Sequence, residues 1–253
     1  MAFLKLYGER NTNTNYLTKI IELNLNVEQL EGTLPKRKTR LYKNKNWLKK
    51  EAVIDEYFDI NFNKNLGWKH SKVLDRECLL SYDIVNDNEI LFVTVTKNPY
   101  SWLLSLYRNP YHQYYKNKPR SFYEFLTTEW KTVSRENVNC SSLVSPVDLW
   151  NIKNRSYINK GGMRFINLIT EDMFRSPKLI VDTIFSGMSS IEKKTFDFVN
   201  FNKSTKDKNK DGDFYRKYYL DEIWKKDLNK QSIEYINSRL DYGLMEYFGY
   251  DIL

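Results

Sequence analysis

Short apolar runs followed by polar loops and helical periodicity recur along the chain. The first run, 3–7, predicts a strand, and the polar stretch 8–15 after it predicts a loop. Apolar side chains then recur at helical spacing, namely Leu17, Ile20, Ile21 and Leu25. This part of the chain therefore predicts a strand, a loop and a helix in that order.

A second unit of the same kind follows in the middle of the sequence. The run 90–96 is β-branched and almost continuously apolar, as strands buried in a parallel sheet are. Lys97 comes next, and Asn98 and Pro99 suit the N-cap and the first position of a helix. The positions after them place one apolar helical face at Trp102, Leu103, Leu106 and Tyr107.

The remaining segments continue the alternation. We expect helices at 122–130, 146–157, 179–187 and 232–248, a strand at 164–170, a loop at 202–213 and an exposed basic insertion at 35–50. Alternating strands and helices predict an α/β fold with a largely parallel central sheet flanked by helices, in a single domain over residues 1–253. Ligands of such sheets bind beyond the carboxyl ends of the strands, where both polar loops fall.

Composition narrows the class of protein. The chain has 253 residues, of which 41% are hydrophobic and 15% aromatic, so it can bury a core and is not disordered as a whole. No run approaches twenty apolar residues, and the start has no long apolar signal-peptide segment, so we expect no membrane span and no secretion. Cys78 and Cys140 make neither a disulfide framework nor a metal cluster, which favours a cytoplasmic protein with no metal site.

The formal net charge of +8 favours anionic partners. A nucleotide with several phosphates, a nucleic acid and an anionic membrane all fit this charge, and so does a mere abundance of lysine. A basic nucleic-acid-binding protein without catalytic activity is the main alternative class, because lysine and aromatic residues alternate in the insertion 35–50. No nucleic-acid-binding motif is present, which makes nucleic acid the less favoured partner.

The loop after the first strand has the composition of an anion site. A strand that leads into a helix offers free backbone N–H groups and the positive end of the helix dipole. The loop adds one charged and five polar side chains as donors: Arg10, Asn11, Thr12, Asn13, Thr14 and Asn15. The nucleotide pattern G-x-x-x-x-G-K-[ST] is absent, which disfavours an ATPase or kinase. An asparagine-rich helix cap without a ligand is the other interpretation.

Three matches in chain order resemble the PAPS-dependent sulfotransferase family. Lys97, Pro99 and Ser105 match the family's strand, turn and helix whose basic residue, usually Arg, and Ser hold the 3′-phosphate of 3′-phosphoadenosine-5′-phosphosulfate (PAPS). The stretch 8–15 resembles the family's 5′-phosphosulfate loop. The late stretch 206–214 is similar to its basic glycine loop, with Lys210 and Gly212 as cofactor-binding positions.

Aligning the first loop with the family's Lys-Ser-Gly-Thr-Thr places Asn13 at the glycine and Asn11 at the catalytic lysine. Arg10, one residue earlier, is then the natural substitute for that lysine. The segment W-K-H at 68–70 and the loop G-E-R-N-T-N-T-N also match one branch of the family. The resemblance implies the P-loop-like sulfotransferase fold, PAPS as co-substrate and PAP (3′-phosphoadenosine-5′-phosphate) as product.

The catalytic base expected from this resemblance is His70, one of two histidines in the chain. Lys69 is expected to neutralise developing charge, whereas Glu9 beside Arg10 is more typical of a structural ion pair. The acceptor is a hydroxyl or amine, with a carbohydrate or small molecule favoured. Aromatic residues that fit an acceptor site are Trp102, Tyr111, Tyr114 and Tyr115. A degenerate sulfotransferase fold used only for binding is a further alternative, because Asn11 replaces the lysine.

Overall fold

The computed structural model describes residues 2–41, 47–113, 118–158, 161–202 and 211–253. The strands are β1 (Ala2–Gly8), β2 (Leu25–Asn26), β3 (Glu28–Gln29), β4 (Glu89–Thr96), β5 (Trp130–Lys131), β6 (Ser142–Leu143), β7 (Phe165–Ile169) and β8 (Glu192–Lys193). The short 3₁₀ helices are η1 (Lys36–Leu41), η2 (Ser134–Glu136) and η3 (Ile223–Asp227).

The α-helices are α1 (Thr14–Asn24), α2 (Trp47–Ile60), α3 (Phe62–Asn65), α4 (Arg76–Leu80), α5 (Asp83–Asn86), α6 (Pro99–Arg108), α7 (Phe122–Thr127), α8 (Pro146–Tyr157), α9 (Thr170–Arg175), α10 (Pro177–Ser186), α11 (Gly212–Leu220), α12 (Lys230–Asn237) and α13 (Tyr242–Phe248). Helix α2 has 14 residues. Within the described stretches, no helix is both long enough and apolar enough to cross a membrane.

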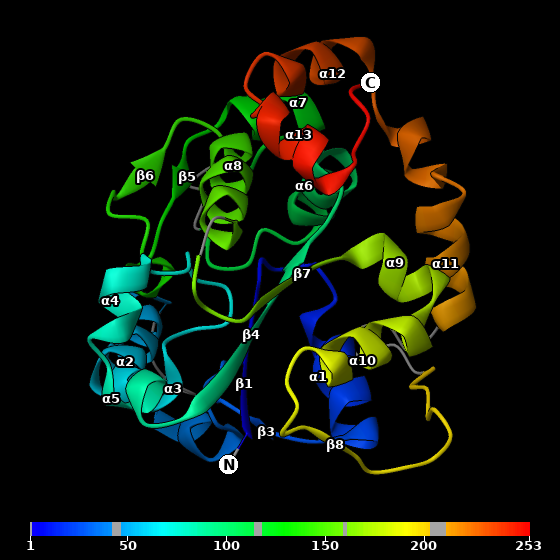
Figure 1. The fold of residues 1–253 in the computed structure, drawn as a ribbon. Coiled ribbons are helices and arrows are strands. Elements are labelled where there is room, and N and C mark those ends of the chain that lie inside the picture. The colour runs from blue at the N-terminus through cyan, green and yellow to red at the C-terminus, as the bar shows by residue number, and fades with distance from the viewer. Residues whose placement is uncertain (1, 42–46, 114–117, 159–160, 203–210) are drawn as a thin grey trace.

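Four strands form the central sheet, in the order β3-β1-β4-β7, and every neighbouring pair is parallel. The predicted α/β class with a largely parallel central sheet is therefore confirmed. In Figure 1, helices α1 and α10 lie on one side of this sheet and α2 to α5 on the other. The loops that follow β1 and β4 leave the sheet at the same edge, because the two strands are adjacent and parallel.

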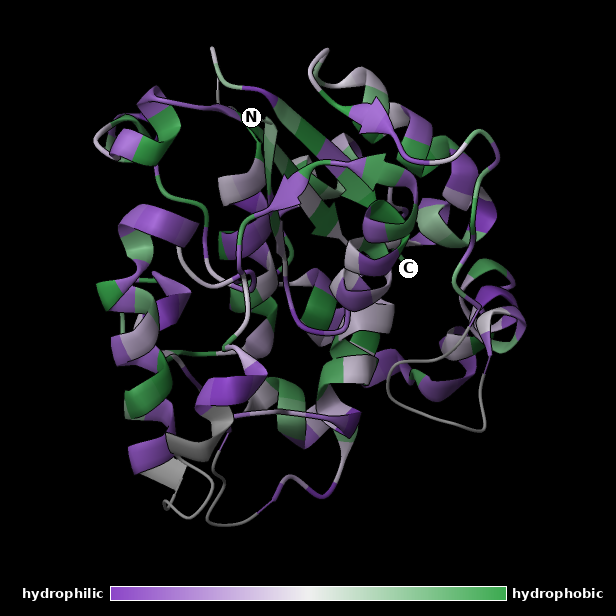
Figure 2. Ribbon diagram, turned by 90° about the horizontal axis from the view of Figure 1, so that it is seen from below, coloured by the Kyte–Doolittle hydropathy of each residue, from purple (hydrophilic) through white to green (hydrophobic). Residues whose placement is uncertain are grey.

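Alternation along β1 and β4 divides the core between the two faces of the sheet. Leu4 and Leu6 pack with Val93 among the side chains under α1 and α10. Tyr7 and Phe92 point to the opposite face and pack in a separate cluster. Period-two alternation of this kind is what a sheet covered on both faces requires. In Figure 2 the hydrophobic strands lie at the centre, inside helices that carry much of the hydrophilic surface.

A third cluster of buried side chains lies beyond the carboxyl ends of the strands. It joins α6, α7, α8, α12 and α13, and three fully buried tryptophans belong to it: Trp102, Trp130 and Trp150. The Trp150 indole donates a hydrogen bond to the Lys97 carbonyl oxygen over 3.0 Å. Through this hydrogen bond the cluster holds the loop after β4 in place.

Most predicted elements are confirmed, and two predicted helices are wrong in part. Asn98 caps α6, because its side-chain oxygen accepts a hydrogen bond from the Tyr100 amide at 3.1 Å. The single helix predicted at 232–248 is two helices, α12 and α13. Asp241 breaks it, because its carboxylate accepts a hydrogen bond from the Leu244 amide at 3.2 Å and starts a new helix there. Helix α7 also ends at Thr127 and is followed by a strand, within the span predicted as one helix.

Candidate functional site

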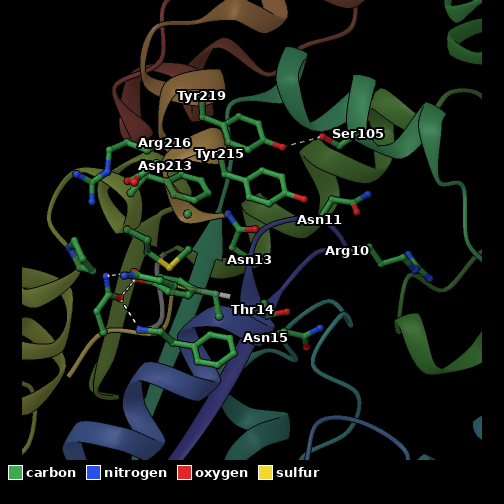
Figure 3. A pocket seen from close by; sticks show the side chains of 18 of the residues that line it. Arg10, Asn11, Asn13, Thr14, Asn15, Ser105, Asp213, Tyr215, Arg216 and Tyr219 are labelled. Atoms are coloured by element: carbon green, nitrogen blue, oxygen red, sulfur yellow. Dashed lines mark hydrogen bonds between the residues drawn. The ribbon is translucent and has the colours of Figure 1, made fainter. Parts of the chain in front are cut away.

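A cavity of about 290 Å³ opens at the carboxyl ends of β1 and β4. The segments that line it include the loop after β1, helix α6, the end of α9, the start of α10, residues 200–202 and helix α11. In Figure 3, Asn11 and Asn13 of the loop face Tyr215 and Tyr219 of α11 across this space. The site therefore lies where the parallel sheet predicts a ligand to bind.

The loop after β1 turns sharply and uses left-handed backbone conformations. A side chain at Gly8 would place its Cβ 2.8 Å from Thr14 Cγ2 and 3.0 Å from the Val95 carbonyl oxygen, so only glycine fits there. Asn11 has φ 67° and Asn13 φ 60°. Asparagine tolerates this region best after glycine, and Asn13 is the residue that the resemblance aligns with the family's glycine.

Two of the predicted donors have defined roles within the loop. The Thr12 hydroxyl donates to the Glu9 carbonyl oxygen over 2.6 Å and closes the turn. Asn13 is the N-cap of α1 without a side-chain cap bond, and its Nδ2 is buried with no hydrogen-bond partner among the described residues. A buried amide donor at the positive end of a helix is suited to an anion.

Lys97 and Ser105 meet as their spacing predicted, and Ser105 lines the cavity on the side opposite the loop. The Lys97 ammonium donates to Ser105 Oγ over 3.0 Å and lies 3.5 Å from the Asn11 carbonyl oxygen. Lys97 is only 1% exposed. In the described part of the chain, no carboxylate lies within ion-pair distance of it. The charge of Lys97 lowers the pKa of the buried Glu171 carboxyl, although burial outweighs this effect and leaves that pKa raised. A buried ammonium with no direct ion pair is suited to a bound anion.

Helix α11 supplies residues that the sequence did not single out. Its positions 212, 215, 216 and 219 form one helical face, and all four line the cavity. The spacing i, i+3, i+4, i+7 was the available signal. Arg216 brings a cation, and the Tyr219 ring stacks on Phe174 at 5.3 Å and 15°. Gly212 thus lines the cavity as expected, whereas Lys210 lies outside the described residues.

His70 lies at the cavity with its tautomer set by the loop. Its Nδ1 is 2.5 Å from the Gly8 carbonyl oxygen, and because a carbonyl only accepts, Nδ1 carries the hydrogen. Nε2 is then the unprotonated nitrogen of a ring that lines the cavity. Burial, followed by the charges of Lys69 and Arg10, holds the His70 pKa well below its usual value. The imidazole is therefore neutral at neutral pH, as a general base must be.

Lys69 and Trp68, the two residues before His70, connect this segment to the loop and to the histidine ring. The Lys69 ammonium donates to Asn15 Oδ1 over 2.6 Å, which joins it to the last residue of the loop. The Trp68 ring meets the His70 ring edge-on, with centroids 5.0 Å apart at 87°. The guanidinium of Arg10 lies 4.6 Å from the Trp68 ring centroid, and that of Arg135 lies 4.5 Å from it.

The Arg10 guanidinium belongs to a buried ionic network. Its Nη1 is 2.8 Å from Glu9 Oε1 and 2.9 Å from Glu136 Oε1, and its Nη2 is 2.7 Å from His112 Nδ1. The expected ion pair between Glu9 and Arg10 is confirmed. In Figure 3 the Arg10 side chain leaves the loop on the side away from Tyr215. This geometry engages the Arg10 guanidinium with three hydrogen-bonding partners.

Lys153, which is fully buried, completes the network. Its ammonium is 2.7 Å from Glu9 Oε2 and 3.3 Å from Glu136 Oε1, and it also donates to the His70 carbonyl oxygen. Two cations therefore balance two carboxylates. These residues come from the loop after β1, η2 and α8, so one network fixes the loop and the backbone of His70 together. We name the set Glu9, Arg10, Glu136 and Lys153 the ionic cluster.

His112, the second histidine of the chain, is buried against this cluster. Its Nε2 donates to the Lys131 carbonyl oxygen over 2.9 Å, so Nδ1 is the lone pair that accepts from Arg10. Protonation would place a hydrogen on Nδ1 as well, and this second donor would face the Arg10 guanidinium, which is itself a cation and a donor. Burial and the charge of Arg10 accordingly lower the His112 pKa to about 3, even though Glu136 opposes the shift.

We expect acid to destabilise the fold from about pH 6.5 downwards. Both histidines have folded pKa values below the unfolded value of 6.5, so the unfolded chain binds protons first and stability falls as pH falls. Each contributes at most about 1.4 kcal/mol per pH unit, and the His112 loss is complete near pH 3. Glu136, whose pKa is lowered to about 2, adds a loss only below 4.5.

Urea unfolding between about pH 7.5 and 5 isolates the histidines from Glu136. His112→Gln does not titrate and should make the decline with falling pH distinctly shallower. Equal slopes in the variant and the unaltered protein would contradict the assignment.

The candidate acceptor aromatics divide into three cases. Trp102 is fully buried, and its indole donates to the Arg10 carbonyl oxygen over 2.8 Å, so it is a core residue. Tyr111 lines the cavity, is 40% exposed and adopts φ 56°. Tyr114 and Tyr115 lie outside the described residues.

Comparisons with known proteins add no relative. No protein-family model matches the chain, and a search of curated proteins found none similar to it. The arguments for function therefore come from the geometry of the cavity and from the resemblance of its loops.

Proposed function

We propose that this chain is a PAPS-dependent sulfotransferase with the P-loop-like sulfotransferase fold. It moves a sulfuryl group from PAPS to a hydroxyl or amine of an acceptor, with a carbohydrate or small molecule favoured. The observation that carries the proposal is Lys97. It is a buried cation that donates to Ser105, a residue that lines the cavity, and no carboxylate of the described residues lies within ion-pair distance of it.

The two walls of the cavity suit the two anionic ends of PAPS. Lys97 and Ser105 are placed to hold the 3′-phosphate. The loop 10–15 and the N-terminus of α1 offer the backbone donors and the Asn13 amide to the 5′-phosphosulfate. The Lys97 ammonium is 3.5 Å from the Asn11 carbonyl oxygen, so the two anion sites adjoin, as they must for a single nucleotide.

In the transfer step, His70 Nε2 takes the proton of the acceptor as its oxygen or nitrogen attacks sulfur in line. The bond from sulfur to the bridging phosphate oxygen breaks, and PAP leaves with the electron pair. Lys69, held on Asn15, supplies positive charge near that oxygen. Arg10 acts through the ionic cluster, by fixing the loop. Positioning and electrostatics supply most of the rate in this kind of transfer.

Calorimetric titration with PAP, with AMP and ADP as controls, tests the proposal. We expect micromolar binding of PAP, much weaker binding of the nucleotides that lack a 3′-phosphate, and a loss of this preference in Lys97→Ala and Ser105→Ala. A lost charge-assisted contact corresponds to about a 10- to 100-fold loss in affinity.

Equal binding of all three nucleotides, or none, would overturn the sulfotransferase proposal. A steeply salt-dependent affinity for DNA or RNA would then favour the nucleic-acid-binding alternative. PAP binding without any transfer to a panel of acceptors would favour a fold that only binds the nucleotide.

A further inference from the structure

Tyr219 lies directly against the pair of residues proposed to hold the 3′-phosphate. The Lys97 ammonium is 3.9 Å from the centroid of its ring, and its hydroxyl oxygen is 3.5 Å from Ser105 Oγ. Figure 3 shows this contact, with the Tyr219 hydroxyl reaching from α11 towards α6. Tyr219 therefore joins the late part of the chain to the second cofactor loop, more than one hundred residues earlier.

The ring is held in place, so the position of its hydroxyl is defined. Phe174 of α9 stacks on it at 5.3 Å and 15°, and Tyr215 lies nearly parallel to it at 6.4 Å and 11°. Burial raises the pKa of Tyr219, but the charge of Lys97 and hydrogen bonds from Lys97 and Ser105 outweigh it and leave the pKa below its usual value. A more acidic hydroxyl is a stronger hydrogen-bond donor to an anion.

The Ser105 hydroxyl has no free hydrogen to donate to an anion. Ser105 Oγ donates to the Ser101 carbonyl oxygen over 2.9 Å while it accepts from Lys97, so its single hydrogen is already engaged within α6. A phosphate held by Lys97 at this point has the Tyr219 hydroxyl within reach.

We propose that Tyr219 is a third ligand of the 3′-phosphate and a determinant of the preference for 3′-phosphorylated nucleotides. The inference rests on the proposed function. It assigns to α11 a hydroxyl donor, in addition to the basic and glycine residues that the sequence placed near 206–214. A 5′-nucleotide puts no anion at this position, so the Tyr219 hydroxyl adds nothing to its affinity.

Titration of Tyr219→Phe with PAP and with AMP tests the assignment. The variant keeps the ring, its stacking on Phe174 and its contact with Lys97, and loses only the hydroxyl. We expect PAP affinity to fall about 10-fold or more, as for a lost hydrogen bond to a charged group, and AMP affinity to stay within about twofold.

The matched control is Tyr218→Phe, one residue earlier on the same helix. The Tyr218 hydroxyl accepts from Arg108 over 2.8 Å, outside the cavity, and its loss should leave both affinities unchanged. Tyr219→Phe with unaltered PAP affinity, in a protein whose preference for PAP over AMP is intact, would overturn the inference and leave the proposed function standing. An equal loss of PAP and AMP affinity would overturn it as well, because such a loss would mean that Tyr219 stabilises the site by packing and not by a contact with the 3′-phosphate. If the unaltered protein shows no preference for PAP over AMP, the proposed function itself is wrong.

Discussion

Replacing Lys153 with methionine is expected to lower the free energy of unfolding by about 3–5 kcal/mol. The Lys153 ammonium is fully buried between Glu9 and Glu136, at 2.7 Å and 3.3 Å. Methionine has nearly the same length, so the packing volume is kept and the charge is lost. The ionic cluster is then left with two buried carboxylates and one cation, and an uncompensated buried charge carries a full desolvation penalty.

Urea unfolding followed by circular dichroism measures this loss. The matched control is Lys178→Met on α10, where the same side chain pairs with Asp182 at 2.6 Å but is 67% exposed. An exposed pair contributes little, so the control should change stability by about 0.5 kcal/mol or less. A loss below about 1 kcal/mol in Lys153→Met would contradict the interpretation of the cluster as one balanced unit.

A double variant tests that balance directly. Adding Glu136→Gln to Lys153→Met removes one carboxylate together with one cation and leaves Arg10 opposite Glu9, which are 2.8 Å apart. We expect the double variant to recover part of the lost stability. Non-additivity of this sign is what a charge-coupled pair produces in a double-mutant cycle.

The sequence specified the parts of the site that local chemistry determines. A buried strand followed by Lys97, an N-cap at Asn98 and a proline at the first helical position predicts one geometry, and the structure has it. The same holds for the loop after β1. Left-handed φ values at Asn11 and Asn13 are available to asparagine and glycine at low cost, so an asparagine-rich turn can replace a glycine-rich one.

The ionic cluster was beyond sequence reasoning because its members are distant along the chain. Arg10 meets Glu136 across 126 residues, and Lys153 meets Glu9 across 144. No local pattern marks Glu136 or Lys153 as buried, since charged residues are normally exposed. The sequence therefore predicted that Arg10 is a free cation near the sulfuryl group. In the structure its guanidinium instead contacts two carboxylates and His112.

His70→Asn is expected to lower the rate of PAP formation from PAPS about 10²- to 10⁴-fold, the usual contribution of a positioned general base. The rate is measured with an acceptor panel, and with water as the acceptor where no other reacts. Asparagine is chosen because its amide nitrogen can replace Nδ1 as the donor to the Gly8 carbonyl oxygen, 2.5 Å away in the histidine. The variant therefore keeps the contact with the loop and removes Nε2.

PAP affinity separates this loss from a loss of the site. It should stay within about twofold in His70→Asn, because the base contacts the acceptor and not the 3′-phosphate. A variant that binds PAP normally and still turns over at the unaltered rate would exclude His70 as the base.

The pH dependence of the rate gives a second and independent test of His70. Its pKa in the free protein lies well below 6.5, so kcat/KM should be flat from neutral pH down past 6.5 and fall only in more acidic solution. Lys69 and Arg10 contribute to that low pKa, and a bound phosphosulfate partly cancels their charge. The pKa of His70 should consequently be higher in the complex, and the acid limb of kcat should lie at higher pH than that of kcat/KM. Coincident limbs would show that the titrating group does not sense the bound anion, which places the base elsewhere.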